Sequence, residues 1–101
     1  MKVYKVFIKE SALHDIDDIA DNILNTSKSI NIVEKYIEKL YYEIKKLSIY
    51  GASLSFCQNK YETNMYGKYI RKMNYKKVAV LFYIENDTIL IQKIKFQHTI
   101  I

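Results

Sequence analysis

The sequence contains a single arginine, Arg71, in a basic stretch of the chain. The other fifteen basic residues are lysines, four of them close to Arg71 at positions 68, 72, 76 and 77. The planar guanidinium group can bind a phosphate or a carboxylate through two parallel hydrogen bonds and keeps its proton. This grouping is typical of a surface that binds phosphate groups. The alternative is a structural ion pair between Arg71 and an acidic residue of a helix.

The net charge lies entirely in the C-terminal part of the chain. Residues 1–59 contain eight lysines and eight acidic residues, whereas residues 60–101 contain eight basic and three acidic residues, which accounts for the net charge of +5. This asymmetry predicts that one surface binds a polyanion, either a nucleic acid or an acidic protein segment. The alternative is that the lysines solvate exposed strand faces and edges.

Other side chains near Arg71 extend the chemistry that this part of the chain offers. Tyr66, Tyr69 and Tyr75 are candidate platforms for stacking of nucleobases. Glu62 is a candidate general base, although a position in a predicted loop also fits a solvated side chain. The sequence has no histidine and cysteine cluster and no glycine-rich phosphate loop, so neither a zinc site nor another cofactor is expected.

Length and composition predict one domain over residues 1–101 and a cytoplasmic location. The N-terminus alternates charged and apolar residues, unlike a signal peptide, and no segment approaches the roughly 20 apolar residues of a membrane span. The single cysteine, Cys57, cannot form an internal disulfide, which suits a reducing compartment. We interpret Cys57 as a packing residue and not as a catalytic thiolate.

The hydrophobic pattern predicts a strand, a helical hairpin and three further strands. Residues 2–8 alternate as in a strand, Ser11 is predicted to cap a first helix, and residues 25–29 interrupt it. A second helix of about five turns follows from Ser29 to the region of Gly51. Residues 51–64 lack periodicity and are predicted to be a loop. Strands are predicted at about 67–73, 76–84 and 88–96, the second of them central, with a tight turn at residues 86 and 87.

This order of elements and three segments resemble the RelE/ParE superfamily, the toxins of bacterial type II toxin-antitoxin modules, of the plasmid stabilisation protein type. The segments are "YKVFIKESALHDIDDIADNIL", "IVEKYIEKLYYEIKKL" and "YIRKMNYKKVAVLFYIENDTILIQKIKF", which together cover nearly the whole chain. The resemblance implies an α+β fold with the order β-α-α-β-β-β. In that fold the helical hairpin packs on a twisted, mostly antiparallel sheet of four strands.

The resemblance also implies partners and an activity. A cognate antitoxin would cover the toxin with an acidic C-terminal segment that is disordered when alone. One branch of the family cleaves mRNA on the ribosome, and another inhibits DNA gyrase. We favour ribosome-dependent cleavage by a metal-independent endoribonuclease. The alternative is a non-enzymatic, ParE-like inhibitor of DNA gyrase that the antitoxin neutralises, and a non-toxic relic is a third possibility. No cofactor or membrane partner is implied, and a homodimer stays open.

Metal-free RNA cleavage needs a base, an acid for the leaving 5′-oxygen, and cations that stabilise the phosphate. By resemblance, Arg71 lies where the ribonuclease branch has a phosphate-binding arginine, and Lys76 lies where many relatives have another arginine. His98, near the family's C-terminal functional segment, can exchange a proton near neutral pH. No tyrosine follows Tyr83, which departs from the ribonuclease pattern. The predicted catalytic residues are therefore Arg71, Lys76 and His98, and the predicted RNA- or anion-binding residues are Lys68, Lys72, Lys77, Tyr69 and Tyr75.

Overall fold

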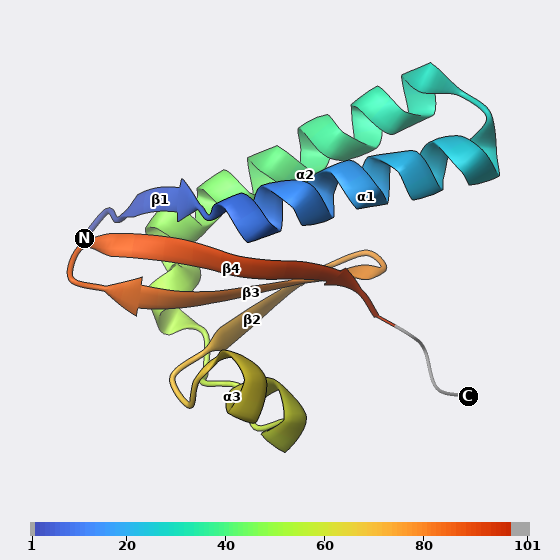
Figure 1. Ribbon diagram of the computed structural model, residues 1–101. Coiled ribbons are helices and arrows are strands. Elements are labelled where there is room, and N and C mark those ends of the chain that lie inside the picture. The colour runs from blue at the N-terminus through green and yellow to red at the C-terminus, as the bar shows by residue number, and fades with distance from the viewer. Residues whose placement is uncertain (1, 98–101) are drawn as a thin grey trace.

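A computed structural model describes residues 2–97 of the chain, and it has the predicted α+β architecture. Two long helices lie side by side over one face of a sheet, and a short helix lies on the other side (Figure 1). In order, the elements are β1 (Lys5–Ile8), α1 (Glu10–Ser27), α2 (Ile30–Tyr50), a 3-10 turn (Gly51–Ser53), α3 (Lys60–Tyr66), β2 (Arg71–Tyr75), β3 (Val78–Glu85) and β4 (Thr88–Phe96).

The four strands form one sheet in the order β1-β4-β3-β2. β3 pairs antiparallel with both β2 and β4, whereas β1 is parallel to β4. The prediction of a mostly antiparallel sheet with β3 inside it is therefore confirmed. Within residues 2–97, no helix is both long enough and apolar enough to cross a membrane.

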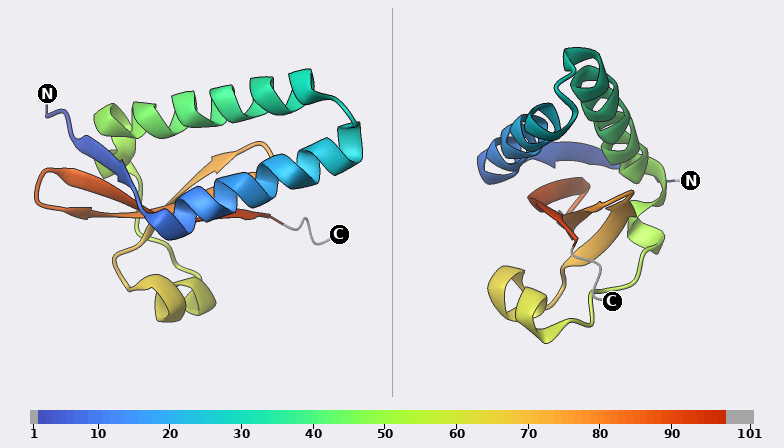
Figure 2. Two further views of the ribbon diagram at one scale, coloured as in Figure 1. Left: turned by 45° about the horizontal axis from the view of Figure 1, so that its top comes forward. Right: turned by 90° about the vertical axis from the view of Figure 1, so that its right-hand side faces the viewer.

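The helical hairpin lies over one face of the sheet in both views of Figure 2, and the hydrophobic core lies between the two layers. Alternate residues of β3 point toward the helices, which is the side-chain period of a strand. Ala79 and Leu81, on the opposite face of β3, are also fully buried. The main core residues are Ala12, Ile16 and Ile19 of α1, Leu40, Ile44 and Leu47 of α2, and Val78, Val80, Phe82, Ile89, Ile91 and Ile94 of the sheet.

The ends of the first helix differ from the prediction. Ser11 does not cap α1, because the N-cap position is Lys9 and the Ser11 hydroxyl donates to the carbonyl of Gln92 at 3.1 Å. The helix also extends into the predicted interruption as far as Ser27, and Lys28, whose φ is 59°, and Ser29 separate it from the second helix. Ser29 does cap the second helix, because its hydroxyl accepts from the Ile32 amide at 3.3 Å.

The predicted loop at residues 51–64 contains a 3-10 turn and most of α3, so that prediction is wrong for these two segments. The Asn59 side chain accepts from the Glu62 amide at 2.9 Å and so starts α3. A polar cap followed three residues later by glutamate is a signature of a helix start. A helix of seven residues is too short to show the periodicity on which the prediction relied.

Gly51 ends α2 near the predicted position but for a different reason. Its φ of −55° is an ordinary helical value, so no positive φ requires a glycine there. A Cβ atom at this position would lie only 2.9 Å from Cδ1 of Ile89. The close approach of the helix end to the sheet therefore explains the glycine.

Both hairpin turns of the sheet place one residue at positive φ. β3 begins at Val78, two residues later than predicted, because Lys76 and Lys77 form the turn after β2 and Lys76 has a φ of 51°. The predicted turn between β3 and β4 is present, with Asn86 at a φ of 57°. Asparagine tolerates this conformation better than most residues.

Asp15 joins α1 to a part of β4 that has no neighbouring strand on that side. β1 pairs with β4 only as far as Ile91. Beyond that point, Asp15 Oδ2 accepts from the Ile94 amide at 3.0 Å, and Oδ1 accepts from Lys93 Nζ at 2.9 Å. The hydrogen bond that Lys93 donates to Asp15 raises the pKa of Lys93. A carboxylate of the helix thus completes the hydrogen bonding of this strand edge.

Replacing Asp15 by alanine is expected to lower the free energy of unfolding by about 2 kcal/mol, because a buried amide and an ammonium group lose their acceptor. Asp21→Ala removes an exposed carboxylate from the same helix and should change stability by less than about 0.5 kcal/mol. Urea denaturation of both variants measures the difference. Equal stabilities of the two variants would contradict this role for Asp15.

Candidate functional site

Glu62 lies between two lysines on the sheet face that α3 covers. The side chain is buried, with the residue 2% exposed. Its carboxylate binds Lys72 Nζ of β2 at 2.8 Å and Lys95 Nζ of β4 at 2.6 Å. The Cys57 thiol donates to the same carboxylate at 3.1 Å. We refer to Glu62, Cys57, Lys72 and Lys95 as the Glu62 cluster.

The Glu62 cluster combines one carboxylate with two ammonium groups. Burial by itself raises the pKa of Glu62, because the charged form loses its hydration. Hydrogen bonds from Lys72, Lys95 and Cys57 outweigh burial and lower the pKa of Glu62 to about 2. Glu62 is therefore ionised at neutral pH, and one carboxylate faces two ammonium groups.

A polar hollow of about 560 Å³ opens beside the Glu62 cluster. Its walls combine ammonium groups, which can bind a phosphate, with tyrosine rings, on which a nucleobase can stack. Side-chain amides complete the lining and can hydrogen-bond to a base or a ribose. The residues that line the hollow are Asn59, Tyr61, Glu62, Tyr66, Lys72, Lys95, Phe96 and Gln97.

Arg71 binds carbonyl groups of its own chain. Its Nη1 donates to the carbonyl oxygen of Ala52 at 3.2 Å and to that of Leu54. The guanidinium group lies 4.3 Å from the centroid of the Phe56 ring. Within residues 2–97 no carboxylate pairs with Arg71. A substitution of Arg71 would therefore also remove side-chain contacts that help to hold the segment before α3 on the sheet.

The other predicted cations lie in two further places. Lys68 Nζ is 5.0 Å from the centroid of the Tyr69 ring, which in turn packs against Phe56 near Arg71. Lys76 and Lys77 form the turn after β2, on the side of the helical hairpin. Of the predicted cations, the structure thus brings only Lys72 into the Glu62 cluster.

The tyrosines and the histidine complete the predicted set. The Tyr69 residue is 60% exposed, whereas the Tyr75 ring packs against Tyr36 of α2, with ring centroids 5.7 Å apart. His98 lies outside the described residues. Among residues 2–97, no group of three histidine, cysteine, aspartate or glutamate side chains is placed to hold a metal ion.

Sequence reasoning missed Lys95 and treated Glu62 as a loop residue. The spacing of Asn59 and Glu62 was the available signal, since it marks the start of a helix that holds Glu62 in place. Nothing in the sequence indicates that Lys72 and Lys95, which are 23 positions apart, meet the same carboxylate. That contact depends on the pairing of β2 and β4 with the two edges of β3.

Neither a protein-family model nor a curated protein sequence matches the chain. Solved structures match it over nearly its whole length. A chain of the chromosomal ParDE toxin-antitoxin system from P. aeruginosa superposes with a TM-score of 0.76 and 14% sequence identity, over 95% of this chain and 98% of that one. A chain of the toxin-antitoxin complex RelBE2 from Mycobacterium tuberculosis superposes with a TM-score of 0.62 and 13% sequence identity, over 96% of this chain and 94% of that one.

The matched chains are the ParE and RelE toxins of these complexes. The protein has the RelE/ParE toxin fold. The coverage of 94–98% of the matched chains means that the RelE/ParE architecture is present from β1 to β4. The fold implied by the resemblance of the sequence is thereby confirmed.

Proposed function

We propose that this RelE/ParE-fold protein is the toxin component of a type II toxin-antitoxin system. The fold extends over the whole described chain, and the two similar structures described above come from toxin-antitoxin systems. The net charge of +5, all of it in residues 60–101, suits a partner with an acidic segment. In this proposal the partner is a cognate antitoxin.

We also propose that the toxin acts by ribosome-dependent cleavage of mRNA, and the Glu62 cluster is the observation that supports this proposal. Lys72 and Lys95 would bind the phosphate at the cleaved bond. As their ammonium groups turn toward the phosphate, Glu62 loses the hydrogen bonds that hold its pKa near 2, and burial then raises the pKa. The carboxylate becomes a stronger base when the substrate is in place.

In the proposed reaction, Glu62 accepts the proton of the ribose 2′-hydroxyl, and the 2′-oxygen attacks phosphorus. The bond from phosphorus to the 5′-oxygen breaks, and the 5′-oxygen takes a proton from a general acid. Lys72 and Lys95 stabilise the negative charge on the phosphate oxygens. The catalytic roles of Arg71, Lys76 and His98 remain predictions from the sequence.

Replacing Lys95 by glutamine is expected to reduce cleavage about 10²-fold, because one of two phosphate-binding cations is removed. The Glu62–Lys72 pair remains in this variant and keeps α3 attached to the sheet. Lys60→Gln is the matched control, since Lys60 is an exposed lysine of α3 outside the Glu62 cluster. Primer extension on translated messages after induction in a bacterial host measures cleavage. Equal numbers of new 5′ ends in the two variants would exclude the proposed role of Lys95.

Inhibition of DNA gyrase is the second candidate function. The superposition on the ParDE chain, with a TM-score of 0.76, is closer than that on the RelBE2 chain, with 0.62. A plasmid supercoiling assay with the purified protein distinguishes the candidates. Blocked supercoiling without new 5′ ends in mRNA would replace the ribonuclease proposal with this one. Unaffected growth after induction would remove both.

A further inference from the structure

A second hollow adjoins the polar hollow beside the Glu62 cluster, since Tyr66 lines both of them. Its volume is about 290 Å³. Tyr83 of β3 lies at its wall, two positions after Leu81 and therefore on the same face of the sheet. We call this hollow the Tyr83 pocket. The polar side chains that line it are those of Tyr66, Lys68, Tyr69, Tyr83 and Gln92.

Gln92 reaches the Tyr83 pocket from a β-bulge in β4. The pairing of β4 with β3 passes from Lys93 directly to Ile91 and skips Gln92, so β4 has one extra residue at this point. The Ser11 hydroxyl of α1 donates to the carbonyl of Gln92 at 3.1 Å and so holds the bulge. Bulges are frequent beside functional sites, where the extra residue redirects a side chain. The bulge thus marks this part of the sheet as a candidate binding site.

Lys9 orients two hydrogen-bond donors of the pocket. Its ammonium group donates to the hydroxyl oxygen of Tyr83 at 3.0 Å and to Oε1 of Gln92 at 3.1 Å. Because the oxygen of Tyr83 already accepts from Lys9, the hydroxyl hydrogen is left to be donated to a ligand. Because Oε1 of Gln92 faces Lys9, the amide nitrogen with its two hydrogens is turned away from Lys9. Two neutral donors are therefore held side by side.

The other side chains of the pocket add positive charge and aromatic rings. Lys68 Nζ lies 5.0 Å from the centroid of the Tyr69 ring. Within the described part of the chain, neither Lys9 nor Lys68 forms an ion pair, and no aspartate or glutamate lines the pocket. Tyr66 and the 60% exposed Tyr69 offer rings on which a planar ligand can stack. The pocket therefore suits a planar ligand with hydrogen-bond acceptors along one edge.

We propose that the Tyr83 pocket binds a guanine base. The edge of guanine with O6 and N7 carries two adjacent acceptors and no donor, whereas the same edge of adenine or cytosine includes an amino donor and that of uracil has one acceptor. O6 and N7 accept from the Tyr83 hydroxyl and the Gln92 amide, and the base stacks on a tyrosine ring. The inference rests on the proposed function only in that the guanine would then belong to the mRNA, next to the cleaved bond.

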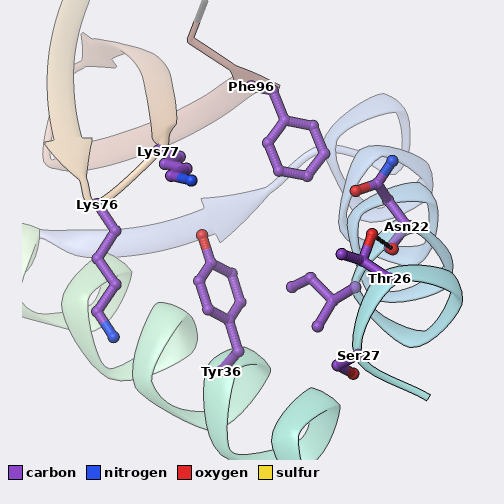
Figure 3. A pocket seen from close by; sticks show the side chains of 8 residues that line it. Asn22, Thr26, Ser27, Tyr36, Lys76, Lys77 and Phe96 are labelled. Carbon is purple, nitrogen blue, oxygen red and sulfur yellow. Dashed lines mark hydrogen bonds between the residues drawn. The ribbon is translucent and has the colours of Figure 1, made fainter. Parts of the chain in front are cut away.

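A hollow on the helical-hairpin side of the sheet, of about 330 Å³, offers no comparable pair of donors. Figure 3 shows the ring of Tyr36 in it, with Phe96 nearby. The side chains of Ile23 and Phe96 form no hydrogen bonds with the edge of a base. The Tyr36 hydroxyl has no hydrogen-bond partner among residues 2–97, so no neighbour fixes its direction as Lys9 does for Tyr83. These differences favour the Tyr83 pocket as the guanine site.

Binding of DNA trinucleotides to the full chain tests the proposal, because DNA lacks the 2′-hydroxyl group and is not cleaved by the proposed reaction. The probe has a fluorescent label and a guanine between two thymines, and fluorescence anisotropy measures its binding. We expect about ten-fold weaker binding when the guanine is replaced by adenine, and also when it is replaced by 7-deazaguanine, which lacks only the N7 acceptor. Equal binding of the guanine and 7-deazaguanine probes would overturn the proposal.

Two matched pairs of variants locate the bound guanine. Tyr83→Phe removes one donor and keeps the ring, so it should weaken binding of the guanine probe about ten-fold, whereas Tyr42→Phe, at an exposed tyrosine of α2, should not. Gln92→Glu exchanges the amide donor for an acceptor that suits the amino group of adenine, so it should abolish the preference for guanine over adenine. Gln58→Glu adds the same charge at an exposed position outside the pocket and should keep the preference. Equal effects within either pair would overturn the proposal.

Competition in the same assay identifies the source of the base. Displacement of the probe by guanosine 5′-monophosphate (GMP), and not by adenosine 5′-monophosphate, supports the proposal with a free nucleotide as the source. Displacement by an unlabelled guanine trinucleotide at concentrations where GMP is inactive supports it with a nucleic-acid strand as the source. Ribose 5-phosphate that displaces the probe as well as GMP does would assign the pocket to a phosphate and overturn the proposal. Growth arrest and mRNA cleavage are measured separately, so failure of guanine binding leaves the proposed toxin function intact.

Discussion

Replacing Glu62 by glutamine is expected to lower the free energy of unfolding at pH 7 by about 3 kcal/mol. The pKa of Glu62 falls from 4.5 to about 2 in the folded protein, and a pKa difference of this size corresponds to about 3 kcal/mol. Glutamine has nearly the same shape but no charge, so Lys72 and Lys95 lose their common counter-ion. Leaving a partly buried ammonium group unpaired is strongly destabilising.

The effect has a defined dependence on pH. The folded pKa of Glu62 lies below the unfolded pKa, so its contribution to stability is complete above about pH 4.5. The contribution declines as the pH falls and is lost as the pH passes through about 2, where the carboxylate takes up a proton. The difference in stability between the native chain and Glu62→Gln should therefore shrink across this range.

Urea denaturation at pH 7, 4.5 and 2.5 measures this effect. Glu38→Gln is the matched control, because Glu38 is an exposed glutamate of α2 without an ion pair in residues 2–97. We expect the control to change stability by less than about 0.5 kcal/mol. A destabilisation by Glu62→Gln that is the same at pH 7 and pH 2.5 would show that the charge of Glu62 is not its cause.

Replacing Phe82 by alanine is expected to have the largest effect on stability, a loss of about 4 kcal/mol. Phe82 is fully buried in β3, and a Cβ atom at Gly51 would lie 3.4 Å from its ring. The ring therefore fills the space between the sheet and the end of α2. Its removal leaves a cavity that the surrounding strands and helices cannot close.

The control for this prediction is Tyr61→Ala, which removes a ring from a residue that is 65% exposed on α3. It should cost less than about 1 kcal/mol in thermal or urea unfolding. Phe82→Leu provides a second point if the alanine variant does not fold, with an expected loss of about 1.5 kcal/mol or less. Equal stabilities of Phe82→Leu and the native chain, together with a small effect of Phe82→Ala, would contradict the packing described for the core.

The long elements were predictable because their apolar residues recur with a clear period. The stripe of Ala12, Ile16 and Ile19 and the stripe of Leu40, Ile44 and Leu47 face the sheet as predicted. The β3 run is apolar on both faces, and it does lie inside the sheet. The position of α3 was not predictable from hydrophobic periodicity, because a helix of two turns is too short to show a period. This helix depends on its Asn59 cap and on the buried side chain of Glu62.

The sequence by itself determined the fold class, the order of the main elements and the concentration of positive charge in residues 60–101. These properties follow from hydrophobic periodicity and composition, which are local. Only the tertiary structure decided which charges meet. It directed Arg71 to the carbonyls of Ala52 and Leu54, placed Lys72 and Lys95 on Glu62, and left Lys76 and Lys77 beside Tyr36. The reason is that ion pairs form between residues distant in sequence, and strand pairing and helix packing alone bring such residues within a few ångströms.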